Sequence, residues 1–162
     1  MSRTKRMMKK KYQKQQKAAN EVALREEKNT LLAIEEQREY GEVINKLAEY
    51  VSAGSVDADM CYMGAYAYFM LGDYERAAQW ADNTMHYDSA HVDARILLAR
   101  ICMLKGQEKD GLKILDFMLA NCFLDSSRQA EVKDMLGYYV ENEKELLVNK
   151  FPNIAVYMNI SR

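Results

Sequence analysis

An internal repeat with a period of 34 constrains the fold of this chain more than any other feature. Shifting the sequence forward by 34 lays Ala58 on Val92 and Gly72 on Gly106, without a gap. Each copy holds two stretches whose apolar residues recur every three or four positions, the spacing of an amphipathic helix. A helical hairpin this short cannot bury both of its faces alone. Neighbouring copies must therefore cover one another.

An earlier, weaker copy precedes these two. Shifting backward by 34 lays Tyr74 on Tyr40, and the second helix of this copy keeps a clear apolar stripe. Its first helix matches only through Leu31 and Ile34. The sequence therefore predicts three helical hairpins, over residues 24–57, 58–91 and 92–125.

The copies resemble the tetratricopeptide repeat. They share its small residues where paired helices cross, its aromatic residue at the start of the second helix and its glycine at the turn. The central copy carries this pattern through Gly64, Ala65, Tyr68, Gly72, Tyr74, Ala77, Ala81 and Asp88. It departs from the pattern at Cys61, where the family has an aromatic, and at Ser89, where it has proline. The resemblance implies an all-α fold, an α-α superhelix of three hairpins plus a C-terminal capping helix. The alternative is an irregular antiparallel helical bundle whose spacing is accidental.

The flanking segments differ in composition from the repeats. Residues 1–19 are rich in Lys and Gln, which predicts a basic, mobile or projecting helical arm, with Asn20 capping the first repeat helix. Residues 126–149 predict the capping helix that a solenoid requires. The tail at 150–162 is apolar with an alternating pattern, which predicts an extended segment docked on its own domain or on a partner.

Composition limits the broad class of the protein. The chain has 162 residues, 49% of them hydrophobic, and a single proline, which suits long helices in one folded domain. The sequence contains no run of 18 apolar residues, so no membrane span is predicted. The N-terminus lacks the apolar run of a secretory signal. Three cysteines without metal-type spacing are expected to be buried small hydrophobes. We therefore expect a cytoplasmic protein.

Charge is divided unequally along the chain. The segment 1–20 holds eight of the 23 basic groups and no acid, so the segment 21–162 keeps 15 basic groups and all 24 acidic groups, a net charge of −9. Such arms commonly contact nucleic acid, anionic lipid or an acidic partner. A solvated helix start, or an arm that screens its own acidic domain, accounts for the same pattern. Nucleic-acid or ribosome association through this arm is the alternative function.

The sequence contains no recognisable catalytic or cofactor-binding constellation. His86 and His91 are the only histidines, and there is no glycine-rich phosphate loop, no His-Glu-x-x-His motif and no paired cysteine motif. The His86, Asp88 and His91 cluster lies where helix ends are expected, and polar residues are common there. We therefore expect no enzyme, no cofactor and no metal site.

The resemblance implies that the first helix of each hairpin lines a concave groove. On the family's register the partner-binding positions are Tyr62, Met63, Tyr66, Phe69, Met70, Ile96, Leu97 and Arg100. A Tyr, Met and Leu surface with one arginine suits an apolar or amphipathic segment of a partner protein. This predicts a non-enzymatic scaffold, adaptor or small chaperone, and the layout is also similar to that of small type III secretion chaperones. Alternatively, the chain's own N-terminal helix or its tail fills the groove.

Some members of the family bind the acidic C-termini of chaperones through a two-carboxylate clamp. The matching positions here are Lys28, Leu32, Met63, Asp93 and Leu97, of which only Lys28 fits. Asp93 is expected to repel the ligand carboxylate. The sequence therefore predicts that this clamp is absent. The sequence does not indicate an oligomeric state.

Overall fold

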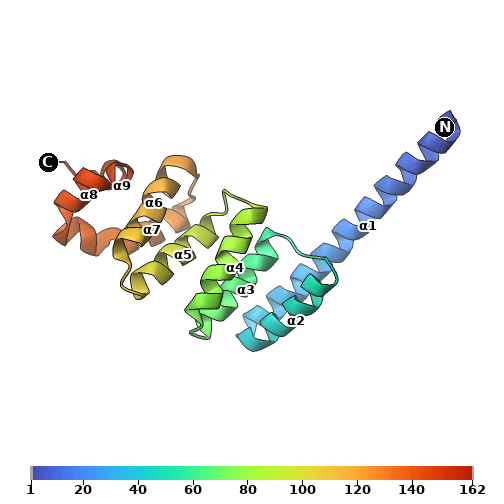
Figure 1. Cartoon of the computed structure of the whole chain (residues 1–162), viewed down its shortest axis with the longest axis horizontal. Helices are drawn as coiled ribbons and strands as arrows, with labels where there is room; N and C mark the ends of the chain where they lie inside the picture. Colours follow the sequence, from blue (N-terminus) through green and yellow to red (C-terminus); the bar gives the residue numbers. More distant parts are fainter. Residues whose placement is uncertain (1, 162) are drawn as a thin grey trace. The chain divides into compact units, whose positions relative to one another are not determined.

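The computed structural model describes residues 2–161 as helices joined by short turns, with no strand in that range. The chain divides into two compact units, one ending at Val56 and the other beginning at Asp57. Figure 1 shows the helices in chain order. The expected all-α repeat fold is confirmed. None of the helices within 2–161 combines the length and the hydropathy needed to cross a bilayer.

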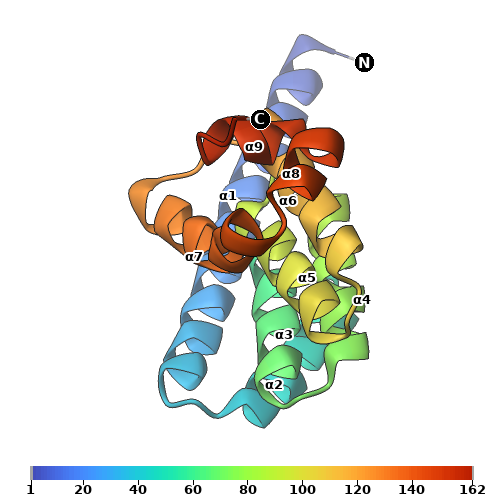
Figure 2. The ribbon, with the colours of Figure 1, turned by 90° about the vertical axis from the view of Figure 1, so that its left-hand side faces the viewer.

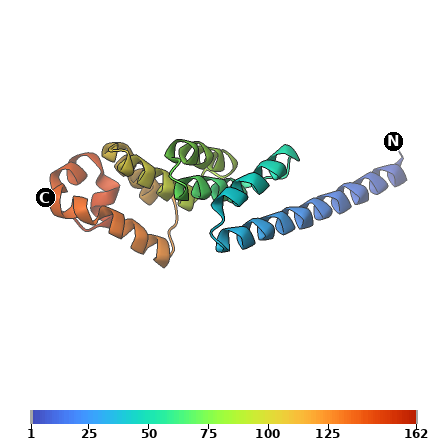
Figure 3. The ribbon, with the colours of Figure 1, turned by 90° about the horizontal axis from the view of Figure 1, so that it is seen from below.

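The first unit consists of two helices, α1 (Arg3–Glu36) and α2 (Tyr40–Ser52), which pack through Leu31, Val43 and Leu47. The expected start at Asn20 is wrong: α1 begins at Arg3, where the Ser2 hydroxyl accepts the Lys5 N–H at 3.4 Å. Figure 3 shows α1 as one unbroken helix. The Lys- and Gln-rich segment joins it because these residues favour helix and no breaker interrupts them.

The second unit continues the repeat register beyond the last hairpin predicted from the sequence. Its helices are α3 (Ala58–Met70), α4 (Tyr74–Tyr87), α5 (Val92–Leu104), α6 (Glu108–Asn121), α7 (Ser126–Asn142), α8 (Lys144–Lys150) and α9 (Pro152–Tyr157). The starts of α3, α5 and α7 follow one another at the repeat period, and so do the starts of α2, α4 and α6. The segment expected to be the capping helix therefore starts in register with the first helices of the preceding hairpins.

The turns inside the hairpins share one conformation at the same spacing. Gly72 and Gly106 have φ values of 81° and 77°, the left-handed region that glycine enters without cost. The third equivalent position is Arg38, with a φ of 59°. In each turn the N–H of the following residue bonds to a carbonyl five positions back, as from Asp73 to Tyr68 at 3.0 Å. The first hairpin is thus built like the others although it lacks the glycine.

Small residues allow the paired helices of the second unit to approach closely. Ala65, Ala77 and Ala81 are fully buried and belong to a core shared by α3, α4 and α5. Where α5 meets α6, a Cβ added to Gly111 would lie 2.9 Å from the Ala99 carbonyl oxygen. The glycine therefore sets how near these two helices can come.

The C-terminal segments differ from the expectation. Residues 126–149 form two helices instead of one, because the chain turns at Glu143, whose φ is −133° and ψ is 37°. The tail is not extended: α9 is a helix whose Ile154 is fully buried, and its N-terminus is capped from α6, where Asp116 Oδ1 accepts the Ile154 N–H at 3.0 Å. Figure 2 shows α9 beside α6 and α8. The tail thus docks on its own unit.

Candidate protein-binding surface

The first helices of successive hairpins in the second unit enclose a shallow depression of about 70 Å³. Three aromatic residues of α3 line one side of it, and residues of α5 form the rest together with one from α7. The lining residues are Tyr62, Tyr66, Phe69, Asp93, Ile96, Leu97, Arg100 and Glu131. This volume is well below the roughly 300–1,000 Å³ of small-molecule pockets. The site is better suited to a side chain presented by a larger partner.

The structure brings together six of the eight residues expected to bind a partner. Tyr62, Tyr66 and Phe69 are half-buried, so their rings reach both the core and the surface. Ile96 and Leu97 are only 3% and 4% exposed and therefore form the floor of the depression. Arg100 lies at its edge.

The remaining two expected residues lie outside this depression. Met63 is 8% exposed and does not line it. Met70 is 46% exposed at the C-terminal end of α3, in the position that Leu104 occupies on α5. Together Met70 and Leu104 offer exposed apolar surface at the ends of the two helices.

Glu131 lines the depression and was missed from the sequence. It lies on α7, and its Oε1 accepts a hydrogen bond from an Arg100 guanidinium nitrogen at 2.8 Å. The two side chains are 39% and 43% exposed, and such pairs contribute at most about 1 kcal/mol. Shifting Leu97 forward by one more period would have found Glu131, because α7 keeps the repeat register.

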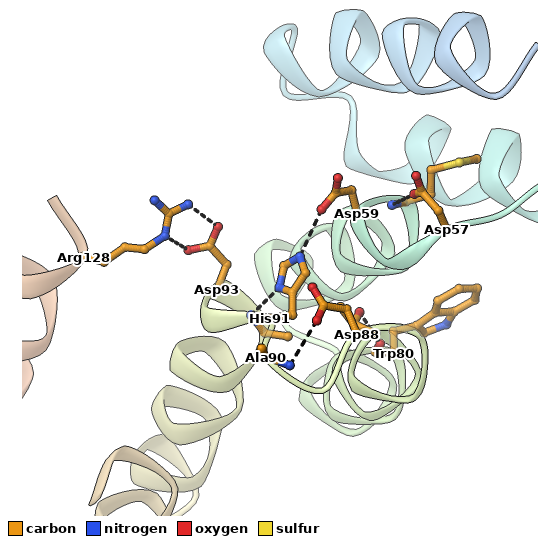
Figure 4. Close-up of polar contacts among 11 residues, drawn as sticks. Asp57, Asp59, Trp80, Asp88, Ala90, His91, Asp93 and Arg128 are labelled. Atoms are coloured by element: carbon orange, nitrogen blue, oxygen red, sulfur yellow. Dashed lines mark hydrogen bonds and ion pairs between the residues drawn. The ribbon is translucent and has the colours of Figure 1, made fainter. Parts of the chain in front are cut away.

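Arg128 of α7 connects the last hairpin to the helix that follows it. Its Nε and Nη2 donate to the two carboxylate oxygens of Asp93 on α5, both at 2.7 Å, and Nη1 bonds to Asp125 (Figure 4). This planar two-bond geometry holds α7 against α5 and so maintains the depression between them. The Asp93 charge is therefore compensated, and it is the buried apolar side chains of Met63 and Leu97 that disfavour a carboxylate clamp.

His91 has a structural role at the start of α5. Its Nδ1 accepts the Ala94 N–H at 3.2 Å, so the ring proton lies on Nε2, which donates to Asp59 Oδ1 at 3.2 Å (Figure 4). The other histidine, His86, bonds through Nδ1 to the Asp82 carbonyl at 2.8 Å. Over residues 2–161 no group of three His, Cys, Asp or Glu side chains is arranged to hold a metal ion.

Two of the three cysteine thiols of the second unit, those of Cys61 and Cys102, have environments that disfavour the thiolate. Cys61 is buried, and burial, followed by the nearby Asp57 carboxylate, raises the pKa of its thiol to about 11. Burial also raises the pKa of the Cys102 thiol. A thiol protonated at neutral pH is a poor nucleophile and packs as a small apolar group.

Comparison with known proteins gives one family match. The family model described as anaphase-promoting complex, cyclosome, subunit 3 matches residues 37–118, just over half of the chain. The matched segment begins at the turn of the first hairpin and ends within α6. A search of curated proteins found no match.

Proposed function

Because the chain belongs to the family described as anaphase-promoting complex, cyclosome, subunit 3, whose repeats are of the tetratricopeptide type, we propose that it is a non-catalytic module that binds a partner protein. The partner contributes an apolar or amphipathic segment, which lies across the first helices of the second unit. The depression between α3, α5 and α7 is the anchor point. Repeat families of this type are generally scaffolds without catalytic activity.

The observation that carries this proposal is the composition of the depression. Tyr62, Tyr66 and Phe69 form an aromatic side, and Ile96 and Leu97 form an aliphatic floor. Partly exposed aromatic side chains beside a buried apolar floor are typical of the centres of protein interfaces. A volume of about 70 Å³ is suited to one apolar side chain of a partner.

The edge of the depression favours an amphipathic partner over a purely apolar one. Arg100 and Glu131 form an exposed ion pair at this edge. Because such a pair is weak, it can open and offer a cation and a carboxylate to charged groups of the partner. A helix that inserts one apolar side chain can thus place charged side chains on both flanks.

The chain's own tail does not compete for this surface. The α9 residues Ile154 and Tyr157 pack into the core that α6, α7 and α8 share, and no residue of the tail lines the depression in the described part of the chain. Of the two segments of the chain that could fill the groove, the tail is therefore not supported as the occupant. This favours a separate protein segment over the tail.

A peptide selection tests the proposal. A library of displayed peptides of about 16 residues, enough for four helical turns, is selected on the full chain, and the dissociation constants of the enriched peptides are then measured. We expect apolar residues at helical spacing. Tyr66→Ala should weaken binding by about tenfold or more, as expected for an aromatic anchor.

Tyr87→Ala is the matched control, because Tyr87 is 60% exposed on α4 and does not line the depression. This variant should bind the selected peptides with unchanged affinity. Equal losses in both variants, or full affinity in Tyr66→Ala, would contradict the proposed site. Enrichment of peptides ending in two carboxylates would contradict the absence of a clamp.

A further inference from the structure

The first half of α1 is an isolated basic helix. Residues 2–23 are all exposed, and the first buried residue of α1 is Leu31. Eight cations lie between Arg3 and Lys17, a length of about 21 Å at 1.5 Å per residue. None of these eight makes an ion pair within residues 2–161. Their charge is therefore available to an external anion.

The cations extend around most of the helix. At 3.6 residues per turn they cover an arc of about 240°. A continuous ridge at spacings of three and four residues runs along the centre of this arc, through Arg3, Arg6, Lys10, Lys14 and Lys17. Lys5 and Lys11 lie at its two margins. A flat anionic surface can meet only about half of a helix, whereas a groove meets its floor and two walls.

The composition of this segment argues against a membrane surface and single-stranded nucleic acid as partners, and groove geometry argues against duplex RNA. The arc without cations holds Met8 and Tyr12 but also Gln15, too little apolar surface for a helix that lies in a membrane interface. Single-stranded nucleic acid is held by stacking on several aromatic rings, and Tyr12 is the only aromatic in this segment. Duplex RNA has a deep, narrow major groove that does not admit a helix.

We propose that residues 3–20 of α1 bind double-stranded DNA by lying in its major groove, with the cations contacting phosphates on both walls. The B-form groove is about 12 Å wide and an α-helix with its side chains is about 10–12 Å across, so a helix uncovered on every side fits it. Lys and Arg contacts to phosphate oxygens supply most of the affinity of such a helix, so binding should depend steeply on salt.

The test measures binding of the full chain to a labelled duplex of about 30 base pairs, by fluorescence anisotropy, as a function of salt. With six or more phosphate contacts, affinity should fall by about a thousandfold or more between 50 and 200 mM salt. Replacing Arg6, Lys10 and Lys14 with Gln keeps helix propensity. This variant should reduce the slope of log K against log salt by about 2.7.

The control variant replaces three exposed lysines elsewhere, Lys105, Lys109 and Lys113, with Gln and should leave both affinity and slope unchanged. Far-ultraviolet circular dichroism checks that each variant keeps its helices. The proposal is overturned if the wild type does not bind the duplex at 50 mM salt, or if the arm variant binds it as the wild type does. It is also overturned if duplex RNA, single-stranded DNA, polyglutamate or anionic vesicles bind as tightly as duplex DNA.

Discussion

Arg38 shows that the turn of a hairpin in this array can form without glycine. It occupies the turn position that Gly72 and Gly106 hold in the next two hairpins, and its φ of 59° is left-handed like theirs. A residue with a Cβ pays about 1–2 kcal/mol in this region. The N–H of Glu39 still bonds to the Ile34 carbonyl at 3.3 Å, so the turn forms in spite of this cost.

Arg38→Gly should therefore stabilise the chain. The gain from relieving the left-handed conformation exceeds the entropy that glycine adds to the unfolded chain, so we expect a net increase of about 0.5–1 kcal/mol in the free energy of unfolding of the first unit. Urea denaturation followed by circular dichroism measures this difference. Arg38→Ala removes the same charge but keeps a Cβ, so it should show no such gain. Equal stability of the Gly and Ala variants would contradict the argument.

Helix pairs are held at their spacing by particular small residues. The contact of α5 with α6 depends on Gly111, because an added Cβ would lie 2.9 Å from the Ala99 carbonyl oxygen and 3.0 Å from Met103 Cγ. The methionine side chain can move, but the backbone carbonyl belongs to α5 and cannot move alone. Substitution here must therefore separate the two helices.

Gly111→Ala should destabilise the second unit although alanine favours helix. We expect a loss of about 1–3 kcal/mol from overpacking, which exceeds the helix-propensity gain of about 1 kcal/mol. Gly137→Ala on α7 is the matched control, because nothing lies within 4 Å of its added Cβ. It should raise stability by up to about 1 kcal/mol. Thermal denaturation of both variants measures these changes in stability. A change of the same sign in both would refute the packing argument.

At the scale of the whole molecule, the second unit contains its own continuous core. One cluster joins α3, α4 and α5 through Ala65, Ala77 and Leu97, and the other runs from α5 to α9 through Leu112, Leu136 and Ile154. The α5 helix belongs to both clusters, so no break separates the helices of this unit. In an array of this type each helix pair is stabilised by its neighbours.

A fragment of residues 57–162 should therefore fold by itself. We expect it to keep the helical content of these residues and to unfold in one cooperative transition, because both clusters lie within it. Circular dichroism during heating, compared with the full chain, checks this. A broad melt without a transition would show that the first unit is needed for folding.

The sequence alone was sufficient to predict the repeat, its period and the hairpins, because these depend on the spacing of apolar and small residues along the chain. It also identified Tyr62, Tyr66, Phe69 and Arg100 as residues of one surface, since residues at equivalent positions of successive repeats must face the same way. That a partner binds there remains a prediction. The start of α1 was misplaced because no breaker or change of propensity marks Asn20 as a boundary.

Only the tertiary structure decided which side chains reach the surface and which segment covers the C-terminal end of the repeats. Ile96 holds the position of Tyr62 in the next repeat, yet it is only 3% exposed whereas Tyr62 is half-buried, because Ile96 belongs to a core that extends into α7. Likewise, the alternating pattern of the tail indicated an extended segment, but an apolar surface on α6 and α7 and a capping carboxylate from Asp116 favour a helix there. Local pattern specifies which faces are apolar, whereas burial depends on partners that lie a whole repeat away in the chain.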